Sequence, residues 1–165
     1  MRVALTGTPG TGKTTASELL EREVIHLNDA IEREGLWSER DAERDSLVVD
    51  ETAVQEWLGD WDGVLESHLA HRFDADLVVV LRCRPDVLET RLVERGESPE
   101  KARENAESEA LDVILSEAVE RYGTGSVHEI DTTERTPEDV AAEIRAAVDG
   151  DREPNPGHLD FIEYL

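Results

Sequence analysis

Several features are scarce or absent in this chain of 165 residues. It contains no run of 18 or more apolar residues, so we expect no transmembrane helix and no membrane partner. Its one cysteine, Cys83, lies in the apolar run 77–84, where a buried, reduced thiol is expected. The first residues lead directly into a glycine-rich loop, which leaves no room for a signal peptide. Together these observations predict a cytoplasmic protein.

Positive charge is also scarce. The formal net charge is −23, from 40 acidic and 17 basic residues, and only Lys13 and Lys101 are lysines. Such a chain repels itself in dilute buffer, whereas molar salt shortens the Debye length to about 3 Å. The composition resembles that of halophilic proteins, so we expect structure to be lost in low salt. The same charge argues against a broad nucleic-acid-binding surface and favours a basic protein partner.

Short apolar segments alternate with helical patterns along the chain. Strands are predicted at residues 2–6, 24–27, 63–66, 76–82 and 127–130. Helices are predicted at residues 12–21, 29–35, 51–58, 85–95, 99–122 and 137–148, and residues 150–165 are expected to form a loop or tail. Alternation of this kind is typical of right-handed βαβ units, so the predicted fold is α/β with a five-stranded parallel sheet flanked by helices.

The most specific motif follows the first predicted strand. Residues 7–14 fit the pattern of glycine, four residues, glycine, lysine and then serine or threonine. Glycines allow the backbone N–H groups to surround phosphate oxygens, and the following helix adds its positive dipole end. Lys13 would reach the β- and γ-phosphates of ATP, and the Thr14 hydroxyl would ligate Mg²⁺. The predicted nucleotide-binding residues of this segment are Gly7, Pro9, Gly10, Thr11, Gly12, Lys13, Thr14 and Thr15.

Polar residues elsewhere suggest the reaction. Arg33, Arg40 and Arg44 follow the second strand and could bind an acceptor phosphate, although a solvated surface explains each arginine equally well. The third strand ends in Glu66-Ser67-His68. Glu66 could hold Mg²⁺ through water, and His68 could orient a water or a phosphate. A metal site made of His68 and His71 is disfavoured, and His71 is expected to be a plain surface histidine.

A second basic cluster surrounds the helix break at residues 96–99. Arg91 and Arg95 lie one helical turn apart, with Lys101 and Arg103 beyond the break. A short loop of this kind can close over a transferring phosphoryl group and neutralise its developing charge. A solvated helix end is the alternative, and the hinge-like Gly96-Glu97-Ser98-Pro99 favours the lid.

The sequence resembles a known family in several motifs. They are Gly-Thr-Pro-Gly-Thr-Gly-Lys-Thr-Thr near the N-terminus, Arg-Asp-Ser-Leu-Val-Val-Asp-Glu at 44–51, Gly-Val-Leu-Glu-Ser-His at 63–68, Leu-Arg-Cys-Arg-Pro-Asp-Val-Leu at 81–88, Arg-Leu-Val-Glu-Arg-Gly at 91–96 and Glu-Asn at 104–105. In these it is similar to the isoenzyme-six type of adenylate kinase, which is also described as a ribosome-assembly ATPase. The resemblance covers about residues 1–148.

This resemblance implies a P-loop NTPase fold and the reaction ATP + AMP ⇌ 2 ADP, with a weaker ATPase activity. It implies a kinase domain at 1–148, with an AMP-binding insertion at about 29–58, a short lid at about 95–106, and a tail at 149–165. From the motifs and the resemblance together, the predicted roles are catalysis for Lys13, His68, Arg91 and Arg95, AMP binding for Arg33, Arg40 and His68, and magnesium binding for Thr14 and Glu66. The remaining implied nucleotide contacts are Arg95 at the phosphates and Asp131 and Thr132 at the adenine.

The same resemblance implies a partner, the small-subunit ribosomal protein uS11, and a role in the maturation of the pre-40S or 30S particle. Glu66 departs from the family, whose members often have aspartate there. Two alternatives to an adenylate kinase stay open. One is an assembly factor whose ATPase switches a protein contact and whose kinase activity is incidental. The other is a kinase for a small metabolite on the same fold.

Overall fold

The central sheet of the molecule is built from five parallel strands. The computed structural model describes residues 1–43 and 46–165, so Arg44 lies outside the described residues. The strands are β1 (Arg2–Thr6), β2 (Val24–His26), β5 (Gly63–Glu66), β6 (Leu77–Arg82) and β7 (Val127–Asp131), in the spatial order β2-β5-β1-β6-β7. Every neighbouring pair runs parallel. The prediction of a five-stranded parallel sheet is therefore confirmed.

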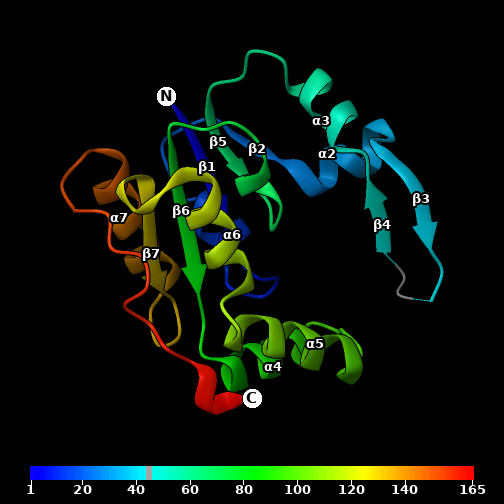
Figure 1. Ribbon diagram of the computed structural model, residues 1–165, viewed down its shortest axis with the longest axis vertical. Helices are drawn as coiled ribbons and strands as arrows, with labels where there is room; N and C mark the ends of the chain where they lie inside the picture. The colour runs from blue at the N-terminus through cyan, green and yellow to red at the C-terminus, as the bar shows by residue number, and fades with distance from the viewer. Residues whose placement is uncertain (44–45) are drawn as a thin grey trace.

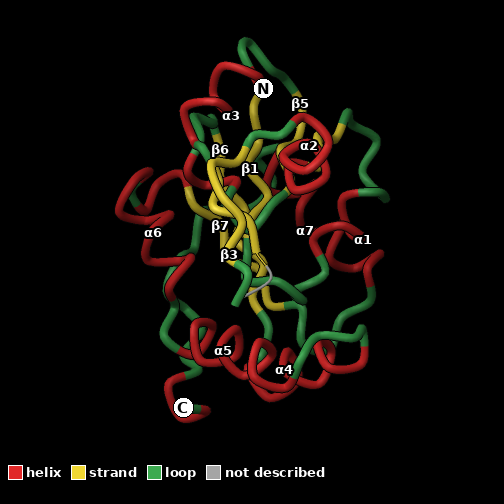
Figure 2. The backbone as a smooth tube through the Cα atoms, turned by 90° about the vertical axis from the view of Figure 1, so that its right-hand side faces the viewer, coloured by secondary structure: helices red, strands yellow, loops and turns green. Residues whose placement is uncertain are grey.

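Helices cover both faces of this sheet (Figure 2). On one face α1 (Lys13–Ser17) and α7 (Pro137–Val148) pack on Leu5, Val79 and Ile130. On the other face α6 (Val113–Tyr122) packs on Val78 and Val80, in a core that also takes in α2 (Leu27–Glu34) and α3 (Glu51–Leu58). Strands that are buried on both faces read as continuous apolar runs, which is why the sequence revealed them. No helix among the described residues is long and apolar enough to cross a membrane.

The remaining helices form one end of the molecule and the short connections. Helices α4 (Pro85–Glu94) and α5 (Pro99–Ala110) lie beyond the carboxyl ends of the strands (Figure 1). The 3₁₀ turns are η1 (Ala70–Arg72), η2 (Thr124–Ser126) and η3 (Ile162–Tyr164). Ser98 caps α5 by accepting a hydrogen bond from the Lys101 backbone N–H, as expected for serine at an N-cap.

The predicted helix 99–122 is wrong as one continuous element. It is broken between α5 and α6, because Asp112 takes a left-handed conformation with φ 56°. Asp112 is the one residue other than glycine with positive φ among those that the structure describes. A hydrogen bond from the buried Arg82 guanidinium to the Asp112 carboxylate accompanies this turn. That contact joins residues 30 positions apart, so no local pattern could have indicated it.

A β-hairpin was missed between α2 and α3. Strands β3 (Trp37–Asp41) and β4 (Ser46–Val49) pair antiparallel and project away from the main sheet (Figure 1). Residues 37–40 are exposed, so β3 lacks the apolar alternation that marks a half-buried strand. The charged sequence of β3 therefore looked like a polar loop.

The C-terminal residues lie against the edge strand β7. The Asn155 side chain accepts a hydrogen bond from the Glu129 backbone N–H, and Arg152 donates to the Glu129 carbonyl. Phe161 is 7% exposed and stacks on the Arg82 guanidinium at 5.3 Å. Edge strands carry unpaired backbone groups, and the tail satisfies some of these on β7.

Candidate active site

The phosphate loop between β1 and α1 is held in a tight cradle. A Cβ atom at Gly7 would lie 2.6 Å from the Leu81 carbonyl oxygen, so only glycine allows this approach to β6. Gly12 precedes α1 with φ 93°, which a side chain would disfavour. The Lys13 ammonium folds back and donates to the carbonyls of Gly7, at 2.8 Å, and Thr8, at 3.2 Å. The strand–loop–helix arrangement expected around the motif is therefore present.

The surroundings of Lys13 shift the pKa of its ammonium group. Burial lowers its pKa to about 8, and Glu66 opposes the shift, while Arg95 adds to it. The side chain is therefore still mostly charged at neutral pH. A desolvated ammonium at the base of a cavity attracts phosphate oxygens more strongly than one in water.

Glu66 lies at the carboxyl end of β5, directly beside the phosphate loop. Its Oε1 atom accepts a hydrogen bond from the Thr14 hydroxyl, at 3.1 Å, and lies 2.9 Å from His26 Nδ1. A hydroxyl and a carboxylate oxygen at this separation are ligands suited to Mg²⁺, directly or through water. The residues present therefore fit a magnesium ion beside the phosphate loop. His26 was missed, because nothing in the sequence joins it to residue 66.

His68 lies two residues after β5. Burial, together with the charges of Lys13 and Arg72, lowers its pKa to about 4, so the imidazole is neutral near pH 7. The Asn28 amide lies 3.4 Å from His68 Nδ1 and accepts a hydrogen bond from Ser67 Oγ at 2.7 Å. A neutral ring at this place can accept a hydrogen bond from a water or orient a phosphate.

Three adjoining cavities open around His68 and Asn28, which line all of them. The inner cavity has a volume of about 140 Å³ and follows the phosphate loop from Pro9 to Thr15, with Glu66 and Arg95 opposite. A second cavity, about 580 Å³, lies under the β3–β4 hairpin. We call it the acceptor cavity because the sequence predicts the acceptor site in this segment. The outer cavity, about 550 Å³, lies between the phosphate loop and α5. The cavity along the phosphate loop and a pocket in the size range of small-molecule sites thus share one wall.

The predicted acceptor arginines are placed differently from one another. Arg40 lines the acceptor cavity, whereas Arg33 pairs with Glu34 and does not line it. The neighbour Glu32 takes the lining position instead. Sequence reasoning missed Arg72, which lines the cavity from turn η1. Its position four residues after His68 on the same connection was the available signal.

The two predicted lid arginines also separate. Arg95 faces the inner and outer cavities. Arg91 instead donates to the carbonyls of Thr132, at 3.0 Å, and Thr133, at 3.2 Å, so it fastens the loop after β7 to helix α4. The Thr132 hydroxyl lies 3.0 Å from the Thr11 carbonyl, and Asp131 accepts hydrogen bonds from Thr133. The predicted adenine loop is thereby tied to the phosphate loop.

The expectation of a surface position for His71 is wrong. His71 is 2% exposed, and its ring nitrogens lie 2.8 Å from the Thr6 hydroxyl and 2.7 Å from Glu117. It therefore joins β1 to α6 instead of facing solvent. Cys83 is buried, as predicted. No cluster of three or more histidine, cysteine, aspartate or glutamate side chains suited to a metal occurs among the described residues.

A parallel sheet of this order, with a glycine-rich phosphate loop after β1 and an anionic side chain at the carboxyl end of β5, is the arrangement of a P-loop kinase. Residues 3–112 match the family model described as an AAA domain. Two relatives named "Putative adenylate kinase", from Natronomonas pharaonis and Halobacterium salinarum, are 62% and 57% identical to this chain over the full length of both proteins. The chain therefore belongs to the AAA-domain family and, within it, to the group of these two relatives, whose fold is that of P-loop kinases.

Solved structures agree on the fold. The crystal structure of shikimate kinase from Aquifex aeolicus matches with a TM-score of 0.53 at 18% identity, over 92% of this chain and 98% of that chain. A shikimate kinase from Bacteroides thetaiotaomicron matches with a TM-score of 0.51 at 20% identity, over 91% of this chain and 98% of that one. At these identities the likeness concerns the fold alone.

Proposed function

We propose that this protein is an adenylate kinase, which transfers the γ-phosphoryl group of ATP to AMP. One observation carries the proposal: His68 and Asn28 line both the inner cavity at the phosphate loop and the acceptor cavity of about 580 Å³. A donor phosphate and an acceptor phosphate would meet at this shared wall. Transfer between phosphates needs positioning and charge stabilisation more than covalent chemistry.

Each residue then has a defined task. The loop N–H groups and Lys13 bind the β- and γ-phosphates, and Arg95 faces the transferring group from the lid side. Arg40 and Arg72 bind the acceptor phosphate within the second cavity. Thr14 and Glu66 would hold Mg²⁺, which when bound supplies charge neutralisation between the β- and γ-phosphates. The loop at 131–133, fastened by Arg91, would receive the adenine.

The arrangement also supports a slow ATPase. When the acceptor cavity holds water in place of AMP, neutral His68 can accept a hydrogen bond from the attacking water. The net charge of −23 suits a basic ribosomal protein such as uS11, so a role in small-subunit maturation is part of this proposal.

A coupled assay in molar KCl with ATP, Mg²⁺ and each candidate acceptor tests the proposal. We expect ADP to form with AMP, and Lys13→Ala to lower turnover by at least about 100-fold. Arg103→Ala removes one positive charge from the exposed face of α5, where Arg103 pairs with Glu107, and serves as the charge control.

Other results would change the conclusion. Indifference to every nucleoside monophosphate would point to a small-metabolite kinase. ATPase that uS11 stimulates, with negligible use of AMP, would favour the assembly factor. Full turnover by Lys13→Ala would contradict the phosphate-loop assignment itself.

A further inference from the structure

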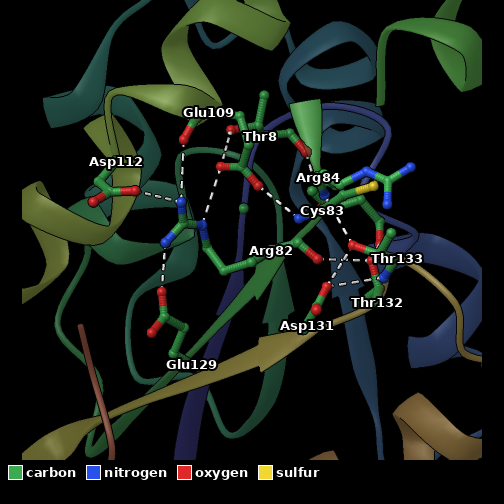
Figure 3. Close-up of polar contacts among 12 residues, drawn as sticks. Thr8, Arg82, Cys83, Arg84, Glu109, Asp112, Glu129, Asp131, Thr132 and Thr133 are labelled. Carbon is green, nitrogen blue, oxygen red and sulfur yellow. Dashed lines mark hydrogen bonds and ion pairs between the residues drawn. The ribbon is translucent and has the colours of Figure 1, made fainter. Parts of the chain in front are cut away.

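One buried carboxylate joins helix α5 to the phosphate loop. Glu109 lies in the last turn of α5 and is 2% exposed. Its Oε1 atom accepts hydrogen bonds from the Thr8 hydroxyl, at 3.1 Å, and from Arg82 Nε, at 3.2 Å. Its Oε2 atom accepts the Cys83 backbone N–H at 2.7 Å. Two segments far apart in the sequence, the phosphate loop and the end of β6, therefore contact this one side chain of α5 (Figure 3).

The buried Arg82 side chain holds the Glu109 carboxylate in place. The guanidinium is 1% exposed and also donates to the Glu109 carbonyl, at 3.1 Å, and to the carboxylates of Asp112 and Glu129. Figure 3 shows it surrounded by these acidic side chains. Burial raises the pKa of Glu109, and the Arg82 charge opposes that rise. The end of α5 and the left-handed turn at Asp112 are thus held by the same buried cation.

Thr8 passes this restraint to the phosphate loop. Its hydroxyl is bound by Glu109, while its carbonyl oxygen accepts from the Thr11 hydroxyl, at 2.9 Å, and from Lys13 Nζ, at 3.2 Å. Fixing the Thr8 side chain therefore fixes the peptide that orients both Thr11 and Lys13. Thr8 is 2% exposed, so water does not replace the Glu109 contact.

We propose that Glu109 is a positioning residue for the donor nucleotide: through the Thr8 hydroxyl it keeps the phosphate loop in the shape that receives the triphosphate. It also joins the C-terminal end of α5 to the phosphate loop and to the end of β6. The inference rests on the proposed ATP site. Because the loop is ordered before nucleotide arrives, losing the tether weakens donor binding and leaves acceptor binding intact.

The decisive pair of variants is Thr8→Val and Thr8→Ser. Valine keeps the shape of threonine and removes the hydroxyl, whereas serine keeps the hydroxyl. A hydrogen bond to a charged group is involved, so we expect Thr8→Val to raise the Kd for a non-hydrolysable ATP analogue by roughly tenfold or more. Thr8→Ser should stay within about threefold of the unaltered protein. Titration calorimetry gives the affinities, and the KM for AMP should not change in either variant.

The outcomes separate a positioning role from a structural one. Thr8→Val that melts earlier but binds the analogue normally would overturn the inference, as would an equal loss of ATP and AMP affinity. If the unaltered protein binds no ATP analogue, the proposed function fails; if it binds and Thr8→Val binds equally well, only the inference fails.

A double-mutant cycle adds a second measurement. Glu109→Gln cannot satisfy the donors of Thr8, Arg82 and Cys83 together, so it should lower both stability and ATP affinity. On that background Thr8→Val should cost little further affinity. Additive losses would contradict the link between the two residues. The Thr8 pair decides the matter even if Glu109→Gln does not fold.

Discussion

The phosphate loop and the acceptor pocket adjoin at His68 and Asn28 but are constructed differently. The loop is a short continuous segment in which the side chains of Lys13 and Thr11 donate to carbonyls of the loop itself. The acceptor pocket draws its lining from α2, the β3–β4 hairpin and the connection after β5. Its hairpin is largely exposed. The turn of the phosphate loop is thus specified by a local motif and held by long-range contacts at Glu109 and Thr132. The lining of the second pocket, by contrast, comes entirely from separate segments that must meet correctly.

The largest expected effect concerns the two arginines near the lid. Arg95→Ala should lower kcat by about 100-fold with little change in ATP affinity, since Arg95 faces the cavity of the transferring phosphate. Arg91→Ala should instead weaken ATP binding, because Arg91 holds the loop at residues 132–133. Steady-state kinetics and calorimetry distinguish the two. Identical behaviour of both variants would contradict separate roles for Arg91 and Arg95.

A smaller effect is expected on the acceptor side. Arg72→Ala should raise the KM for AMP by roughly tenfold and leave the KM for ATP unchanged. The reason is that Arg72 lines the acceptor cavity and does not line the inner cavity at the phosphate loop. Arg33→Ala is the matched control, since Arg33 lies outside that cavity and pairs with Glu34. A change in AMP use by Arg33→Ala, with none by Arg72→Ala, would reverse the assignment.

The two sides should also differ in their response to pH. The pKa of free Lys13 is about 8, and bound phosphates favour its charged form, so ATP affinity should be level below pH 7 and fall above pH 8. The fall approaches about tenfold per pH unit, with proton uptake on binding. Acceptor arginines do not titrate in this range, so AMP affinity should stay level. Calorimetry in two buffers measures both, and level ATP affinity up to pH 9.5 would contradict the prediction.

The smallest effect is expected from salt acting on the two regions separately. Dilute buffer should destabilise this chain of net charge −23, and the exposed hairpin should open before the strands beside the phosphate loop. Hydrogen exchange of β3 and β4, compared with β1 in dilute and in molar KCl, measures this. A melting temperature unchanged between the two solutions would contradict the halophilic interpretation as a whole.

Local signals predicted some elements and long-range contacts decided others. The phosphate loop, the parallel strands and the N-caps are each specified within a few residues, so the sequence predicted them. The position of Arg72, the His26–Glu66 pair and the break at Asp112 arise only when distant segments pack together. The hairpin was missed because β3 is exposed on both faces and carries no apolar period. Sequence reasoning thus found the phosphate loop itself, but missed the long-range contacts around it and part of the predicted acceptor site.

The single thiol, Cys83, is a natural probe for the opening of helices α4 and α5 away from the sheet. Cys83 is fully buried among Leu88, Leu92 and Ala102, between the end of β6 and helices α4 and α5. Burial raises its pKa to about 11, so the reactive thiolate is rare as well as inaccessible. Alkylating reagents can reach it only when these helices part from the sheet. The rate of labelling therefore reports how often these helices open, with no engineered probe. A nucleotide that stabilises the closed position of the helices should slow the labelling.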